Sequence, residues 1–141
     1  ELDRLTGEHR ILSTHIVHEN GQSLHPEIDR GQVTGAFIQG MGWCTMEDLV
    51  WDSHGRYLSA NPSTYKIPGI RDLPELLDIE LLTSDSRESS VFGSKATGEP
   101  PFIYGMAVFF AIRDAIKRAG SSRELSFPAT PEAIVRALQD E

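Results

Sequence analysis

The stretch PEIDRGQVTGAFIQGMGWCTM, residues 26–46, decides the fold because its apolar residues recur at the spacing of an α-helix. Pro26 suits the first turn of a helix, so the pattern predicts a helix from about residue 27 to about residue 46. Its apolar stripe consists of Val33, Phe37, Met41 and Cys44. The helix is rich in glycine, and each interior glycine costs about 1 kcal/mol relative to alanine. We therefore expect a feature of the folded protein to compensate for that cost.

A second stripe on this helix carries almost no side chains. Gln32, Gly35, Gln39 and Gly42 share one face, at positions i, i+3, i+7 and i+10. Glycines let another backbone or a flat ligand come close, and carboxamides donate and accept hydrogen bonds without bringing charge. The stripe allows two interpretations, which are contact with a second helix through small residues and a face turned toward a cofactor.

Short strands are expected on both sides of this helix. Apolar and polar residues alternate from Arg10 to His18, and Asn20-Gly21 is typical of a turn that closes a strand. The other predicted strands are Leu2–Leu5, a hairpin of Leu49–Trp51 with Arg56–Leu58, and Leu76–Thr83. Residues 84–90 are predicted to form a polar loop.

A second long helix is predicted from about Pro101 to about Ala119, with Gly120 ending it. This segment is apolar around most of its circumference until Arg113, which indicates a helix buried in an interior. A short third helix follows, capped by Thr130 and preceding the end of the chain.

The composition excludes several classes of protein. The 141 residues fit one compact domain or part of a larger one. A formal net charge of −8, without any basic block, argues against nucleic acid and membrane surfaces as partners. Cys44 is the single cysteine, so an internal disulfide and a cysteine zinc site are excluded, and a cytoplasmic setting is the default expectation.

Other sequence signals are weaker. The apolar run Pro100–Ile112 is shorter than the roughly 20 residues that cross a bilayer. The five histidines lack the spacing of metal ligands, so we predict no metal-ligating residues and expect these side chains to face solvent. The chain begins Glu-Leu-Asp-Arg, without methionine and in the middle of a strand pattern, and we expect it to be a piece of a longer protein.

The stretch GSKATGEPP, residues 93–101, is the second unusual segment. Its composition predicts a loop with exposed backbone N–H groups of the kind that bind anions. It is not a Walker A sequence, because Lys95 lies between the glycines and Glu99 follows Gly98. Glu99 precedes an apolar helix, whose N-terminus would stabilise its charge while apolar neighbours desolvate it. Glu99 is therefore a candidate general base, or alternatively a plain helix-capping glutamate.

Three motifs follow one another along the chain, GQVTGAFIQG at residues 31–40, PSTYKIP at 62–68 and SKATGEPP at 94–101. In order and approximate spacing they closely resemble the molybdopterin-binding subunit of the molybdenum hydroxylases, the family that includes xanthine dehydrogenases and aldehyde oxidases. The resemblance extends to PATPE at residues 128–132 and so covers essentially the whole chain. Two positions depart from it, since an apolar residue is more usual at Arg30 and an asparagine is common at His25.

The resemblance implies a fold and a set of site residues. It implies an α+β fold with two long, partly buried helices packed on small mixed or antiparallel sheets, residues 1–141 being the C-terminal part of a molybdopterin-binding domain. Glu99 matches the catalytic glutamate, the general base that removes a proton during hydroxylation. Gln32 matches a glutamine that hydrogen-bonds the pterin. The loop that runs against the cofactor would include Ser94, Lys95, Ala96 and Gly98. The metal would be held by dithiolene sulfurs of the pterin, so no protein ligand to it is implied.

The implied activity is hydroxylation of a purine, hypoxanthine or xanthine, by a molybdenum-molybdopterin enzyme. The implied partners are the remainder of the molybdopterin subunit and iron–sulfur and FAD subunits or domains, since a single cysteine cannot ligate a cluster. Two alternatives remain, a non-catalytic assembly module of such a complex and a related enzyme that acts on aldehydes or another heterocycle. The isolated chain is expected to carry the base without turning over substrate.

Overall fold

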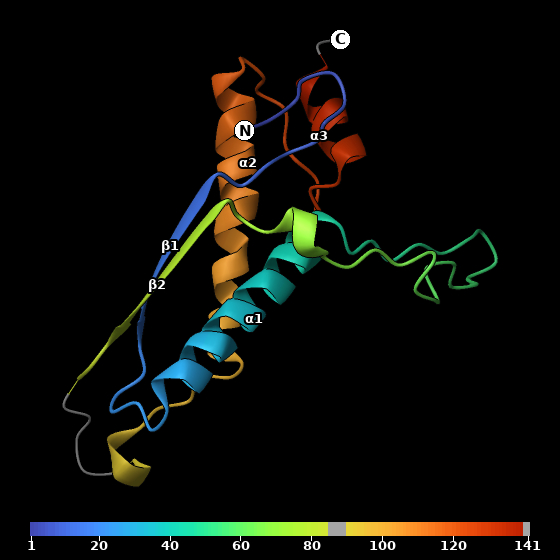
Figure 1. The fold of residues 1–141 in the computed structure, drawn as a ribbon. Coiled ribbons are helices and arrows are strands. Elements are labelled where there is room, and N and C mark those ends of the chain that lie inside the picture. The colour runs from blue at the N-terminus through green and yellow to red at the C-terminus, as the bar shows by residue number, and fades with distance from the viewer. Residues whose placement is uncertain (85–89, 140–141) are drawn as a thin grey trace.

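The computed structural model describes residues 1–84 and 90–139. Its regular elements are the strands β1 (Ser13–Glu19) and β2 (Leu76–Leu82) and the helices α1 (Pro26–Thr45), α2 (Met106–Arg118) and α3 (Pro131–Leu138), with short 3₁₀ helices η1 (Ile70–Asp72), η2 (Val91–Gly93) and η3 (Pro100–Gly105). The predicted loop at residues 84–90 lies largely outside the described residues. Figure 1 shows α1 crossing α2, with the chain between α1 and η1 projecting away as a long irregular arm.

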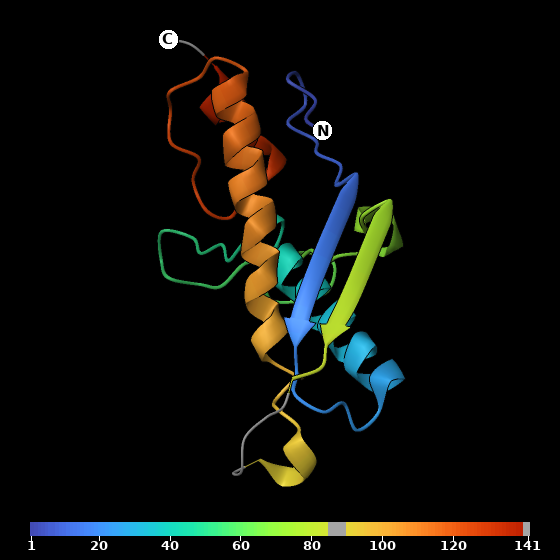
Figure 2. The same ribbon diagram turned by 90° about the vertical axis from the view of Figure 1, so that its left-hand side faces the viewer.

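The two strands form a parallel pair, whereas small mixed or antiparallel sheets were predicted. Ser13 lies opposite Leu76 and Glu19 opposite Leu82, and Figure 2 shows both arrows running the same way. Parallel neighbours require a long crossover connection, and α1 with the arm supplies it. The prediction of antiparallel or mixed sheets is therefore wrong for this pair.

Antiparallel pairing occurs only as isolated bridges within the described ranges. Leu2 pairs with His9, so the predicted strand Leu2–Leu5 is reduced to a single bridge beside the turn at Gly7, whose φ is +73°. Trp51 pairs with Tyr57, which confirms the predicted hairpin in its shortest form.

The predicted apolar stripe of α1 forms the centre of the core and is confirmed. Val33, Phe37, Met41 and Cys44 are each at most 1% exposed. Three residues at helical spacing on α2 pack against this stripe, together with the buried face of α3 and one residue of β1. These partners are Val108, Ile112, Ile116, Ala133, Ile134, Ala137 and Ile16.

The second predicted helix is divided at Gly105 into η3 and α2. The segment is partly buried, as the resemblance implied, but it is less enclosed than its apolar circumference indicated, because Ile103 is 57% and Phe110 44% exposed. Gly120, with φ at +99°, ends the helical segment as predicted. Thr130 caps α3 by accepting a hydrogen bond from the Ala133 N–H at 3.2 Å, which is also as predicted. No helix within residues 1–84 and 90–139 has both the length and the apolar character needed to cross a membrane.

Candidate functional site

Some glycines of α1 pack closely against other parts of the chain, and others lie on an open face of the helix. A Cβ on Gly40 would lie 2.0 Å from the carbonyl oxygen of Phe102, and one on Gly105 would lie 2.2 Å from the carbonyl carbon of Gly40. The backbones of α1 and η3 therefore touch directly, and this contact compensates for glycine inside the helix. Gly42 is also in packing, since its Cβ would lie 2.3 Å from Cγ of Pro68.

The remaining part of the predicted stripe is open. Gln32, Gly35 and Gln39 are exposed, and a Cβ on Gly35 would meet nothing within 4 Å among the described residues. The helix therefore shows both expected features. Small residues pack against other backbone and side chains toward its C-terminal end, and an uncharged polar face is open in its N-terminal half.

The loop around residue 95 docks on the end of β1. Ser94 forms an antiparallel bridge with Gly21, and the Lys95 N–H donates to the carbonyl of Asn20 at 2.9 Å. Lys95 Nζ lies 2.5 Å from Oε2 of Glu19, a residue that sequence reasoning missed because 76 positions separate the pair. The Lys95 ammonium, with hydrogen bonds from the Ser84 hydroxyl and a backbone N–H, lowers the pKa of Glu19 from 4.5 to about 2.

Only the second half of this loop offers backbone donors to a ligand. The N–H groups of Gly93, Ser94 and Lys95 donate to carbonyls of the protein. Those of Ala96 and Gly98 have no partner in the part of the chain that the structure describes, and both residues are exposed. The predicted anion-binding loop is therefore shorter than expected.

Gln32 and Gly98 meet although 66 residues separate them in sequence. A Cβ on Gly98 would lie 3.4 Å from the amide oxygen of Gln32. The open face of α1 and the free part of the loop therefore form one surface. This surface joins three of the predicted cofactor-contact residues, Gln32, Ala96 and Gly98. The side chains of the other two are engaged in the protein, since the Ser94 hydroxyl donates to the carbonyl of Val91 at 2.7 Å and Lys95 binds Glu19.

Glu99 follows Gly98 at the beginning of η3. Its side chain makes no capping hydrogen bond, so the interpretation as a plain helix cap is wrong. The expected desolvation is also absent from this chain, because Glu99 is exposed. Its carboxylate has no ion-pair or hydrogen-bond partner among residues 1–84 and 90–139, which leaves it available to a molecule bound on the adjacent surface.

One histidine contradicts the expectation that all five face solvent. His18 is 5% exposed, and its Nδ1 lies 2.8 Å from the hydroxyl oxygen of Tyr104 in η3. The alternation of β1 carries a signal for this burial, since His18 shares a face with the buried Ile16.

The two departures from the family pattern have structural roles. His25 caps α1 by accepting a hydrogen bond from the Ile28 N–H at 3.4 Å. The guanidinium of Arg30 donates to the carbonyl of Ile79, which ties α1 to β2.

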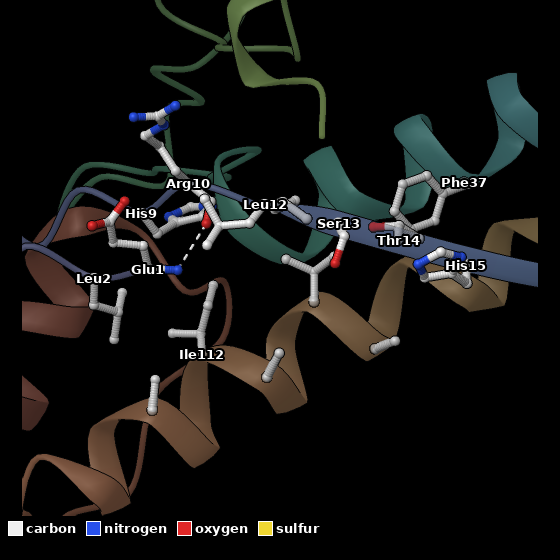
Figure 3. Close-up of a pocket in the computed structure, with 15 residues that line it drawn as sticks. Glu1, Leu2, His9, Arg10, Leu12, Ser13, Thr14, His15, Phe37 and Ile112 are labelled. Atoms are coloured by element: carbon white, nitrogen blue, oxygen red, sulfur yellow. Dashed lines mark hydrogen bonds between the residues drawn. The ribbon is translucent and has the colours of Figure 1, made fainter. Parts of the chain in front are cut away.

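A cavity of about 420 Å³ lies elsewhere, between the N-terminal segment, β1 and α2. Figure 3 shows Leu2, Leu12, Phe37 and Ile112 around it. None of the predicted site residues lines it, so the cavity and the Gln32–Gly98 surface are separate features. No group of three or more His, Cys, Asp or Glu side chains that could hold a metal ion occurs among the described residues.

The chain is similar to known proteins along its whole length. The family model described as "molybdopterin cofactor-binding domain" matches residues 1–74. A xanthine dehydrogenase of Calliphora vicina is 45% identical over all of this chain, and a xanthine dehydrogenase/oxidase of Mus musculus is 44% identical over the same extent. This chain spans 11% of the length of each relative.

A solved structure supports the same assignment. Quinoline 2-oxidoreductase from Pseudomonas putida 86 superposes with a TM-score of 0.84 and 27% identity, over 99% of this chain and 17% of that one. The family model covers more than half of the 141 residues, and the fold agrees with the match. The chain therefore belongs to the molybdopterin cofactor-binding domain family.

Proposed function

We propose that the chain is the C-terminal part of the molybdopterin-binding domain of a molybdenum hydroxylase that acts in the cytoplasm on a purine, hypoxanthine or xanthine. Membership of the family and the similarity to xanthine dehydrogenases support the class of enzyme. The observation that carries the proposal for the site is the contact between Gln32 and Gly98, directly beside Glu99.

The exposed surface fits a flat, polar cofactor that must be held without charge neutralisation. The Gln32 carboxamide can both donate and accept. The N–H groups of Ala96 and Gly98 have no partner among residues 1–84 and 90–139, so they can donate to a ligand. Gly35 leaves space above the helix, so a planar ring can approach its backbone. In this proposal Ser94 and Lys95 act through the shape of the loop, since their side chains are engaged in the protein.

When bound, the molybdenum-molybdopterin cofactor would supply the two-electron redox chemistry of the hydroxylation. Glu99 accepts a proton on its carboxylate, which is the task of a general base. Its position between a glycine and two prolines limits the movement of its backbone. Partner subunits or domains carry the iron–sulfur clusters and FAD that remove the electrons.

A second candidate function is a non-catalytic assembly module. The exposed apolar side chains of Ile103 and Phe110 favour contact with further protein. A module of this kind needs no free carboxylate at residue 99, so one substitution separates the two candidates.

The deciding experiment uses the full-length protein and compares Glu99→Gln with Glu124→Gln, another exposed loop glutamate. Glu99→Gln should lower kcat on xanthine by roughly 10²–10⁴-fold while molybdenum content stays at the wild-type level, because a base contributes to the transition state and not to cofactor binding. Glu124→Gln should keep its activity. Retention of most activity by Glu99→Gln would refute the role of Glu99 as base. If the enzyme turns over aldehydes but no purine, only the proposed purine substrate would be refuted.

A further inference from the structure

The last two residues of β1 hold the segment that contains Glu99 from both of its ends. Glu19 binds Lys95, four residues before Glu99, and His18 binds Tyr104, five residues after it. Figure 2 shows the C-terminal end of β1 beside the beginning of α2, where this segment runs.

The contact at the start of the segment is a network centred on Glu19. Its carboxylate lies 2.5 Å from Lys95 Nζ and accepts a hydrogen bond from the Gly21 N–H at 2.8 Å. The Lys95 backbone N–H donates to Asn20 in the same place. Main chain and side chain of Lys95 are thus both fixed to the end of β1.

The contact at the end of the segment is buried. His18 Nδ1 lies 2.8 Å from the Tyr104 hydroxyl, and the two rings meet edge to face with centroids 5.9 Å apart. His18 Nε2 has no hydrogen-bond partner among residues 1–84 and 90–139. A buried polar atom without a partner costs free energy, so an imidazole here is poorly explained by packing alone.

The middle of the segment is fixed by α1. Pro101 is less than 2% exposed, and η3 lies on the backbone of Gly40 so closely that no Cβ fits between them. Glu99 is an exposed residue that lies between these three fixed points.

We propose that His18 and Glu19 are positioning residues, which set the place of the Glu99 carboxylate through Tyr104 and Lys95. This inference rests on the proposed role of Glu99 as base. Because catalytic groups must be held close to their productive geometry, a small displacement of Glu99 slows the reaction without weakening substrate binding.

The test measures kcat per bound molybdenum and KM in the full-length enzyme carrying Tyr104→Phe, Glu19→Gln or Glu99→Gln. Tyr104→Phe removes one hydroxyl, and Glu19→Gln removes the charge that holds Lys95 while keeping the shape. Tyr104→Phe and Glu19→Gln should each lower kcat per molybdenum about 10-fold, with KM changed less than 2-fold. Two matched controls lose comparable contacts elsewhere in the chain. Tyr65→Phe loses a hydrogen bond to Glu47, and Lys66→Met loses an ion pair to Asp72. Both should keep kcat per molybdenum within 2-fold of wild type.

A purely structural role predicts a different result, namely fewer molybdenum-loaded molecules that each turn over at the wild-type rate. Unchanged kcat per molybdenum in both Tyr104→Phe and Glu19→Gln, with Glu99→Gln inactive, would overturn the positioning role and leave the proposed function standing. An active Glu99→Gln enzyme would overturn both.

Discussion

The backbone contact between α1 and η3 makes a quantitative prediction about Gly40→Ala. The new Cβ would lie 2.0 Å from the Phe102 carbonyl oxygen and must move more than an ångström to reach an ordinary contact. Overpacking of this kind costs typically about 1–3 kcal/mol, and a backbone obstacle places the cost near about 3. Alanine is about 1 kcal/mol more favourable than glycine inside a helix, which offsets part of this cost. We therefore expect a net loss of about 2 kcal/mol in the free energy of unfolding.

Gly35→Ala is the matched control in the same helix. Its Cβ meets nothing within 4 Å among the described residues, so the variant should gain up to about 1 kcal/mol from helix propensity alone. The free energies of unfolding of the two variants should then differ by about 3 kcal/mol. With a dependence on urea of about 2 kcal/mol/M, this corresponds to about 1.5 M between their urea midpoints. Urea denaturation followed by circular dichroism measures this difference. If Gly40→Ala is as stable as Gly35→Ala, the proposed backbone contact is wrong.

Three further predictions follow from side chains of the loop and the arm. The pKa of Glu19 is lowered to about 2 in the folded chain, so its carboxylate stabilises the fold above the unfolded value of 4.5 and loses this effect as pH falls toward 2. The stability advantage of wild type over Glu19→Gln should shrink across that range in urea titrations, and a difference that is independent of pH would contradict it. The hydrogen bond to Glu47 raises the pKa of Tyr65 to about 12, so Glu47→Gln should shift one phenol to lower pH in an ultraviolet titration. Gly98→Ala should cost less than about 0.5 kcal/mol, because its Cβ makes an ordinary contact with Gln32, whereas Gly98→Val should displace that amide and reduce molybdenum content in the full-length protein. Normal molybdenum content in Gly98→Val would contradict the role of this surface.

Local sequence signals predicted the helices well. The predicted helix 27–46 differs by one residue at each end from α1 at Pro26–Thr45, because Pro26 and the apolar stripe are local features. The cap of α3 at Thr130 was equally local. The division of the second helix at Gly105 was not predictable in this way, since it depends on contact with Gly40 in another element.

Long-range pairing was the main source of error. The parallel register of β1 with β2 depends on a crossover of more than fifty residues, and alternation within a strand does not specify its partner. The Glu19–Lys95 pair and the Gln32–Gly98 contact likewise join distant parts of the chain. For the site, the three motifs supplied the candidate residues through resemblance, while the structure supplied their proximity.

The most direct test of the central claim is an experimental structure of the full-length protein with its molybdenum cofactor bound. We expect the Gln32 carboxamide to hydrogen-bond the pterin and the Glu99 carboxylate to face the metal from the beginning of η3. A Glu99 side chain in bulk solvent, or turned away from a cofactor on the Gln32–Gly98 surface, would contradict this expectation.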